Sequence, residues 1–439
     1  MSLERAITLP HATALVVGTI IGASIFVQAS EITALVPSAG GVALVWIAAG
    51  LLTLGGALVC AELASAFPRS GGVYVFLREI YSPALGFLWG WAMFWSMHTG
   101  IVAAIATVFA RYVGYFVPMG DAGLRAVAVG AIVLLTAVNY RGVSLGTRLQ
   151  TTVTIGKVLA VAAIIAVGVL VAPAAPVAPA PAAAPAEGVS LLNFLAAVGA
   201  GLFAFGGWHM VTYTAEETVA PERTIPRALA IGCIVVTIAY VGLNTVYLDV
   251  LPIDRVITST RVAADAFQAL VGPRGASIIS AVVIMSAFGA LNGIILAGPR
   301  VYYSMAQDGL LFSKAAELHA RFRTPGLALA LQGGWATVLA ATGTYRELFT
   351  RVIYTEWIFF GLLAVGLVLV RRRPGYVARW PMPGVPLVPI VFALASFAIV
   401  VSQMAADPRS SAIGLAMVVS GLPVYWWWTR RAGAARASV

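Results

Sequence analysis

The chain has 439 residues, of which 60% are hydrophobic and only 10% charged, and its mean hydropathy is +0.94. Soluble domains carry about 25% charged residues, so this composition excludes an ordinary soluble protein. The formal net charge is +10, but no Lys/Arg block is long enough to form a basic face for nucleic acid. The sequence therefore predicts an all-α polytopic membrane protein in a lipid bilayer, without a nucleic-acid partner.

The first residues and the cysteines add little to this assignment. Residues 1–12 place a basic residue before an apolar run and superficially resemble a signal peptide, but no polar domain follows, so we assign them to the first span. Cys60 and Cys233 each lie in an apolar run without CxxC or metal-ligand spacing. We therefore expect two buried free thiols, no metal site and no cofactor.

Apolar runs separated by polar, Pro- or Gly-marked breaks predict twelve transmembrane helices. They lie at approximately residues 12–36, 41–66, 84–117, 122–140, 150–172, 190–219, 226–251, 274–305, 326–343, 347–370, 386–405 and 410–429. With this topology, 19 of the 27 basic residues fall on the side of the N-terminus. The positive-inside rule then places both termini in the cytoplasm and the protein in the cell (inner) membrane.

A Pro/Ala-rich segment divides the chain. Residues 173–189 favour an extended conformation outside the membrane and separate the five spans of residues 1–172 from the five of residues 190–373. Because five crossings are an odd number, the sixth helix enters from the side opposite to the first. This predicts two inverted repeats, followed by two further helices and a short cytoplasmic tail in residues 374–439.

Two spans carry glycines at their centres, where a membrane helix should stay intact. Residues 18–26 read GTIIGASIF in the first span, and residues 203–208 read FAFGGW in the sixth. Small residues also let helices pack closely, which alone would explain one such segment. Unwound backbone at membrane depth, however, must be buried in protein or line a cavity, and two broken helices in corresponding positions indicate a transporter site.

The directions of the two helices predict what the breaks bind. Carbonyl groups near Thr19 and Ile20 end the first half of helix 1, and amide groups at Gly22, Ala23 and Ser24 begin its second half. Helix 6 offers further carbonyls at Phe203, Ala204 and Gly206. Helix N-termini attract anions and helix C-termini attract cations, so the site suits an α-amino acid. Phe203 and Trp208 can wall this site, with core packing as the alternative for Trp208.

These motifs resemble the amino acid–polyamine–organocation superfamily, and its L-amino-acid transporter branch with bacterial relatives in particular. The resemblance rests on residues 18–26, 68–91, 203–217 and 221–229 and covers essentially the first ten spans. It implies the leucine-transporter-type 5+5 inverted repeat with helices 1 and 6 broken. It also implies a carboxylate site at Gly22, Ala23 and Ser24, an ammonium site at Ile20, Phe203, Ala204 and Gly206, and Phe203 as the gating aromatic. The family's usual Gly-Ser-Gly reads Gly22-Ala23-Ser24 here, which moves the hydroxyl by one residue.

Several polar residues lie at membrane depth. Lys157 lies about eight residues into the fifth helix, where the charge is costly unless it is functional or the side chain snorkels to the interface. The resemblance implies that this lysine replaces a sodium ion beside the break in helix 1. Asn292 is either interhelical glue or part of the site around Lys157. Glu356 borders the implied substrate pocket, and it could bind a proton, pair with Arg351 or a basic substrate, or bond within the bundle.

His98 and His209 are alternatives for proton coupling, although a packed, hydrogen-bonded histidine is the commoner case. Together these features predict a sodium-independent secondary transporter, either permease or exchanger, of neutral L-amino acids by alternating access. The alternative substrates are cationic amino acids or polyamines selected by Glu356. An enzyme or a channel is disfavoured, since neither a catalytic motif nor a repeated filter is found. Exchange, uniport, proton symport and the oligomeric state stay open.

Overall fold

The computed structural model describes residues 3–22, 24–26, 28–171, 189–259 and 261–437. Ala23 and most of the Pro/Ala-rich segment therefore lie outside the described residues. The elements are α1 (Leu9–Ile20), η1 (Ser24–Phe26), α2 (Gln28–Leu35), α3 (Ala39–Ala66), α4 (Val73–Ile80), α5 (Pro83–Ala92), η2 (Met93–Met97), α6 (His98–Phe116), α7 (Asp121–Tyr140), α8 (Val143–Val171), α9 (Leu191–Ala204), η3 (Trp208–Glu217), α10 (Pro221–Val250), α11 (Ile253–Thr258), α12 (Val262–Val271), α13 (Arg274–Ala297), α14 (Pro299–Gln307), η4 (Ser313–Ala316), α15 (Gly326–Thr342), α16 (Tyr345–Val370), α17 (Leu387–Ala406), α18 (Pro408–Val419) and α19 (Gly421–Ala437).

Nine helical segments in the described part of the chain are long and apolar enough to cross a membrane. They correspond to nine of the predicted spans, namely all except the first, ninth and tenth. Those three contain the shorter apolar helices Leu9–Ile20, Gly326–Thr342 and Tyr354–Val370. A multi-pass membrane protein is thus confirmed, whereas the number twelve and the inverted repeat stay predictions.

Two helices begin earlier than the sequence predicted. Helix α8 begins at Val143 rather than near residue 150, and α10 begins at Pro221 rather than near residue 226. The polar residues Ser144, Thr147 and Arg148 precede the predicted span, but they belong to α8, and Pro at the first helical position starts α10. Lys157 therefore lies roughly 21 Å along its helix, and the predicted depth of about eight residues is wrong.

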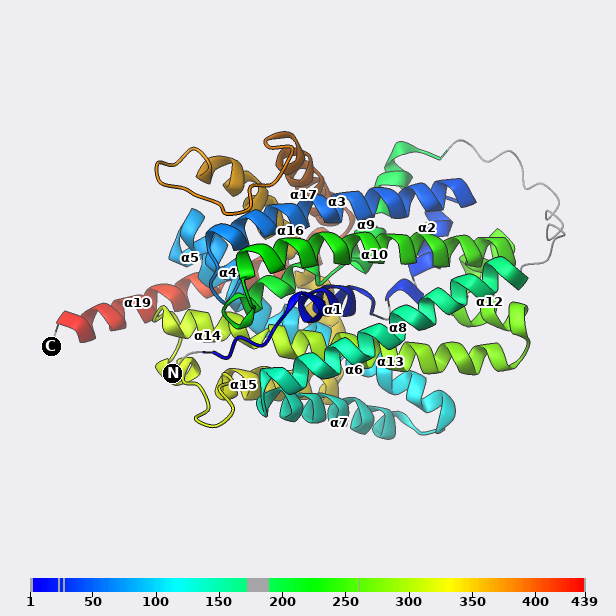
Figure 1. The fold of residues 1–439 in the computed structure, drawn as a ribbon, viewed down its shortest axis with the longest axis horizontal. Helices are drawn as coiled ribbons and strands as arrows, with labels where there is room; N and C mark the ends of the chain where they lie inside the picture. Colours follow the sequence, from blue (N-terminus) through cyan, green and yellow to red (C-terminus); the bar gives the residue numbers. More distant parts are fainter. Residues whose placement is uncertain (1–2, 23, 27, 172–188, 260, 438–439) are drawn as a thin grey trace.

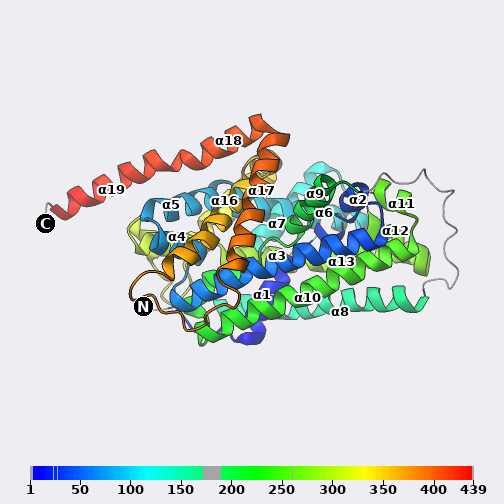
Figure 2. The same cartoon turned by 90° about the horizontal axis from the view of Figure 1, so that it is seen from above.

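Helices α3, α8, α10 and α13 run along the longest axis of the molecule, and both chain ends lie at the same end of the bundle (Figures 1 and 2). Helix α1 is at the centre, where it contacts α8, α10, α13 and η3. Eight of its residues are buried, in a run that includes its last turn. The fold therefore buries the end of a helix, whose free carbonyl groups need partners. Cys60 and Cys233 are buried and free, as predicted.

Candidate functional site

The first helix break lies at the end of α1. The helix stops at Ile20, Ile21 and Gly22 are non-helical, and the short 3₁₀ segment η1 begins at Ser24. The amide of Gly22, which the sequence predicted to be a free donor, donates to the carbonyl oxygen of Ile20 at 2.7 Å. A substrate carboxylate at this position would therefore have to compete with a backbone hydrogen bond.

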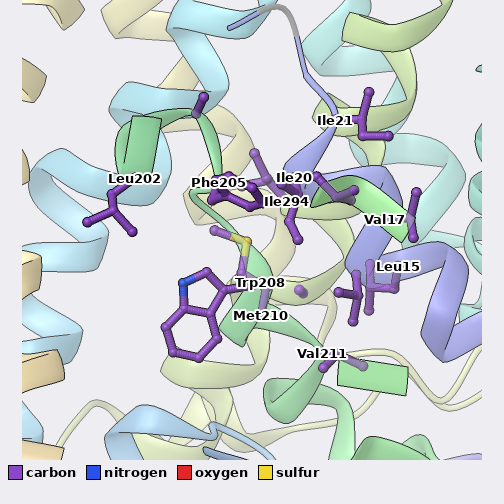
Figure 3. Close-up of a cluster of buried hydrophobic side chains, with 14 of the residues drawn as sticks. Leu15, Val17, Ile20, Ile21, Leu202, Phe205, Trp208, Met210, Val211 and Ile294 are labelled. Carbon is purple, nitrogen blue, oxygen red and sulfur yellow. The ribbon is translucent and has the colours of Figure 1, made fainter. Parts of the chain in front are cut away.

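The second break follows α9, which ends at Ala204. The amide of Gly206 donates to the carbonyl oxygen of Phe203 at 3.1 Å, and Gly207 adopts a left-handed conformation with φ 96° before η3 begins. A Cβ atom at Gly207 would lie 3.2 Å from Cβ of Thr19, and the Thr19 hydroxyl lies 3.1 Å from the Gly207 carbonyl oxygen. The two breaks are therefore in direct contact (Figure 3).

Tyr240 of α10 joins the two breaks. Its hydroxyl lies 3.0 Å from the carbonyl oxygens of both Ile20 and Ala204. Sequence reasoning missed Tyr240 because nothing distinguishes it from the other aromatic residues of an apolar span. Each carbonyl oxygen has two lone pairs. The Ile20 oxygen also accepts from the Gly22 amide, so a ligand ammonium would have to replace one of its two donors, whereas Tyr240 is the one side-chain donor to the Ala204 oxygen among the described residues.

The two predicted aromatic walls differ in their surroundings. Phe203 remains 43% exposed, so its ring is available to cover a ligand. Trp208 is only 2% exposed, and its indole packs 5.1 Å from the Phe360 ring and 6.4 Å from that of Phe392. In Figure 3 it points away from Ile20. The core-packing alternative describes Trp208 better than a wall of the ligand site.

Lys157 reaches the first break from α8. Its Nζ atom donates to the carbonyl oxygens of Gly18 at 2.9 Å, Ile21 at 2.7 Å and Ser286 at 3.2 Å. An ammonium has three donors, and all three are used. The side chain is fully buried, which contradicts snorkelling. The Ser286 hydroxyl lies within hydrogen-bond distance of the carbonyl oxygens of Ile21 and Gly22, so Ser286 also fastens α13 to the first break.

Asn292 lies further along α13 than Ser286 and forms hydrogen bonds with two other helices. Its amide group donates to the Gln150 side chain at 2.9 Å and to the Gly146 carbonyl oxygen at 3.1 Å, and its oxygen accepts from Asn139 at 2.9 Å. These bonds link α7, α8 and α13. They match the interhelical alternative, while Ser286 is the α13 residue that bonds with Lys157.

Glu356 and His209 form a pair that the sequence did not indicate. Glu356 Oε1 lies 3.5 Å from His209 Nε2, and the side chains are 14% and 1% exposed, respectively. The side chain of Arg351, a suggested partner, lies outside the described part. His98 Nδ1 lies 3.2 Å from the Tyr302 hydroxyl, which agrees with a packed histidine. Residues separated by 147 positions meet here, so sequence spacing could not reveal the pair.

A buried ion pair closes the end of the bundle that holds the chain termini. Arg300 donates to both carboxylate oxygens of Glu217, at 2.7 and 2.8 Å, and both side chains are essentially inaccessible. The Glu217 carbonyl oxygen accepts from the amides of Ala6 and Ile7, and Ile7 in turn accepts from Val219. The segment before α1 is thereby fastened to the end of η3.

Comparison with known proteins defines the class. The family model "Amino acid permease" matches residues 7–427. The serine/threonine exchanger SteT of Bacillus subtilis is 30% identical over 433 residues, which cover 98% of both chains. The human large neutral amino acids transporter small subunit 2 is 32% identical over 97% of this chain and 81% of its own length. The human cystine/glutamate transporter is 27% identical over 97% and 85%.

The chain therefore belongs to the amino acid permease family. Its family and relatives are transporters, so the enzyme alternative is excluded, and the resemblance inferred from the motifs is confirmed.

Proposed function

We propose that this protein is a sodium-independent secondary transporter of neutral L-amino acids that works by alternating access. The observation that carries the proposal is the meeting of two helix breaks, fastened together by Tyr240 and flanked by the buried ammonium of Lys157. Two interrupted helices that meet inside the bundle characterise the substrate sites of secondary transporters. The names of the relatives, which include a serine/threonine exchanger and a large neutral amino acid transporter, support this substrate class.

In this proposal the two breaks would supply both poles that a zwitterion requires. The carbonyl oxygens of Ile20 and Ala204 converge on one hydroxyl and would accept from a substrate ammonium. The backbone that begins η1 at Ser24 would receive the carboxylate, because helix N-termini favour anions. Phe203 would cover the ligand. Binding by backbone atoms leaves the side chain of the substrate to be chosen by the surrounding pocket.

Sodium independence follows from Lys157 in this proposal. Its ammonium already donates to the carbonyl oxygens of Gly18 and Ile21 at the end of α1. A sodium ion at this place would therefore lack unoccupied carbonyl ligands and would be repelled by the charge of the lysine. The fixed positive charge of Lys157 then takes the structural role that a bound sodium ion would have.

A cationic amino acid or polyamine is the second candidate, because Glu356 is a carboxylate close to the break. Its position 3.5 Å from His209 favours neutral substrates, because a protonated His209 would neutralise the carboxylate that a cationic substrate needs. For localisation we propose the inner membrane with both termini in the cytoplasm, which agrees with both chain ends lying at one end of the bundle (Figure 1).

Uptake and counterflow in proteoliposomes test the proposal. The purified full chain is given labelled L-serine, L-threonine, L-leucine, L-arginine and putrescine, in sodium and in choline buffers. We expect accumulation of neutral L-amino acids with equal rates in both buffers. Exclusive transport of arginine or putrescine would favour the second candidate, and sodium-dependent uptake would contradict the proposal.

A further inference from the structure

A cluster of buried polar side chains lies directly beyond the second helix break. His209 is the second residue of η3, and its ring lies 5.5 Å from that of Tyr213. The Tyr213 ring lies 5.6 Å from that of His98, the first residue of α6. Glu356 of α16 and Tyr302 of α14 complete the cluster. Four separate parts of the chain therefore bring titratable groups together inside the membrane region.

Several atoms of this cluster lack hydrogen-bond partners. Both ring nitrogens of His209, Nε2 of His98 and the hydroxyl of Tyr213 are buried without hydrogen-bond geometry to any described group. The Tyr213 hydroxyl approaches the Trp89 indole but does not meet that geometry. Native proteins satisfy most buried polar atoms, so such a concentration requires an explanation. A purely structural network would be expected to have satisfied its members.

Glu356 Oε1 and His209 Nε2 are 3.5 Å apart. They form no hydrogen bond in this structure, but they are close enough for the two groups to share one proton. With one proton held between them, the carboxyl and imidazole have no net charge. Without that proton, the pair has a negative charge, which is unfavourable where water is excluded. Sealing the site from water thus favours proton binding, and hydrating the site favours release. Glu356 is the more accessible partner, with 14% exposure against 1% for His209, so hydration of the site would act on the carboxyl first.

The position of the pair couples it to the substrate site. His209 is two residues beyond Gly207, whose carbonyl oxygen contacts Thr19 at the other break, whereas Glu356 belongs to α16. Any movement of η3 against α16 changes the distance between imidazole and carboxyl. The π-helical segment η2 (Met93–Met97) immediately precedes His98, and such segments occur frequently at functional sites.

We propose that the Glu356–His209 pair binds one proton that crosses the membrane together with the amino acid, which makes the transporter proton-coupled. This inference rests on the proposed function. The proton comes from water on one side and returns to water on the other, and no other bond changes. The titratable groups that face the pair are Tyr213 of η3 itself and His98 of α6. Tyr302 of α14 and Cys60 of α3 lie one step further out, against Tyr213, and Tyr302 also contacts His98.

The test uses proteoliposomes that contain the full chain and internal pyranine. The probe is whichever of L-serine, L-threonine and L-leucine gives the largest counterflow at symmetrical pH. For the wild type, an outside-acid gradient should raise initial net uptake several-fold, and the amino acid should acidify the interior. The measured quantity is the ratio of uptake with and without the gradient. Glu356→Gln and His209→Gln should lower that ratio to about one, and Glu356→Asp should restore part of it.

Asp254→Asn, which removes an exposed carboxylate on α11, is the control and should keep the wild-type ratio. A wild type that transports amino acids without acidification or response to the gradient would overturn the proton role while leaving the proposed function intact. Wild-type coupling in Glu356→Gln would also overturn it. Loss of counterflow in both neutralised variants and in Glu356→Asp would assign the pair a structural role. Absence of counterflow in the wild type would instead contradict the proposed function.

Discussion

The ammonium of Lys157 donates to the carbonyl oxygen of Ile21 at 2.7 Å and thereby fastens α8 to the end of α1. The two residues are 136 positions apart in sequence. Their contact lies deep in the bundle, where an ammonium can persist only with a full set of partners. It supplies a fixed cation at the site where a helix ends and where cations are favoured.

Lys157→Ala should abolish most transport without unfolding the protein. A hydrogen bond from a charged donor contributes about 1.5–3 kcal/mol, so its loss should lower the uptake rate by tenfold or more. Lys157→Arg should restore little, since a planar guanidinium cannot replace a compact ammonium. Initial uptake rates, normalised to protein that elutes as a single species in detergent, measure the effect. An unchanged maximal rate in Lys157→Ala would contradict the role assigned to this charge.

Tyr240→Phe should weaken substrate binding by about fivefold, because the lost hydrogen bond contributes about 1 kcal/mol to the alignment of the two breaks. Tyr247→Phe is the matched control. Tyr247 is also a buried tyrosine of α10, but its hydroxyl has no partner among the described groups. Affinity from a competition series should therefore fall for Tyr240→Phe alone. Equal affinities in the two variants would remove Tyr240 from the site.

Gly207→Ala should impair transport through backbone strain. Gly207 has φ 96°, and a non-glycine residue in such a conformation costs about 1–3 kcal/mol. The added Cβ would also press against Thr19 of the other break. Gly199→Ala provides the control, because its Cβ would meet no atom within 4 Å in the middle of α9. We expect strongly reduced uptake only in Gly207→Ala, and normal uptake in this variant would argue against a rigid break.

Glu217→Gln should destabilise the protein by about 3–5 kcal/mol, since it leaves the buried guanidinium of Arg300 without its charged partner. Glu222→Gln breaks the exposed pair with Arg379, at 3.4 Å and with Arg379 69% exposed, and should change stability by about 0–1 kcal/mol. Thermal unfolding in one detergent compares the two variants. Equal shifts of the melting temperature would contradict the importance of the buried pair.

The sequence alone predicted the parts of the site that depend on where a helix is interrupted. Glycines within two apolar spans predicted breaks near Gly22 and Gly206, and the structure has non-helical backbone at both. The isolated charge of Lys157 in an apolar helix likewise predicted a functional residue there. These predictions succeeded because the bilayer penalises interrupted helices and buried charges strongly.

Other features depend on which helix faces lie together, and sequence spacing does not contain that information. Tyr240 is one of several aromatic residues in its span, and only packing brings its hydroxyl to Ile20 and Ala204. The Glu356–His209 pair arises in the same way. The start of α8 at Val143 was missed because polar residues that are buried within a protein continue a helix as well as apolar ones do.

Recognition of a zwitterion by backbone atoms of the two breaks is the central claim, and competition by blocked substrates tests it most directly. Counterflow of the best neutral amino acid is measured against the unlabelled parent, its carboxamide and its N-acetyl derivative. We expect each blocked compound to compete at least about tenfold more weakly, because each loses one charged hydrogen-bonding group. A carboxamide or an N-acetyl derivative that competes as well as the parent would contradict it.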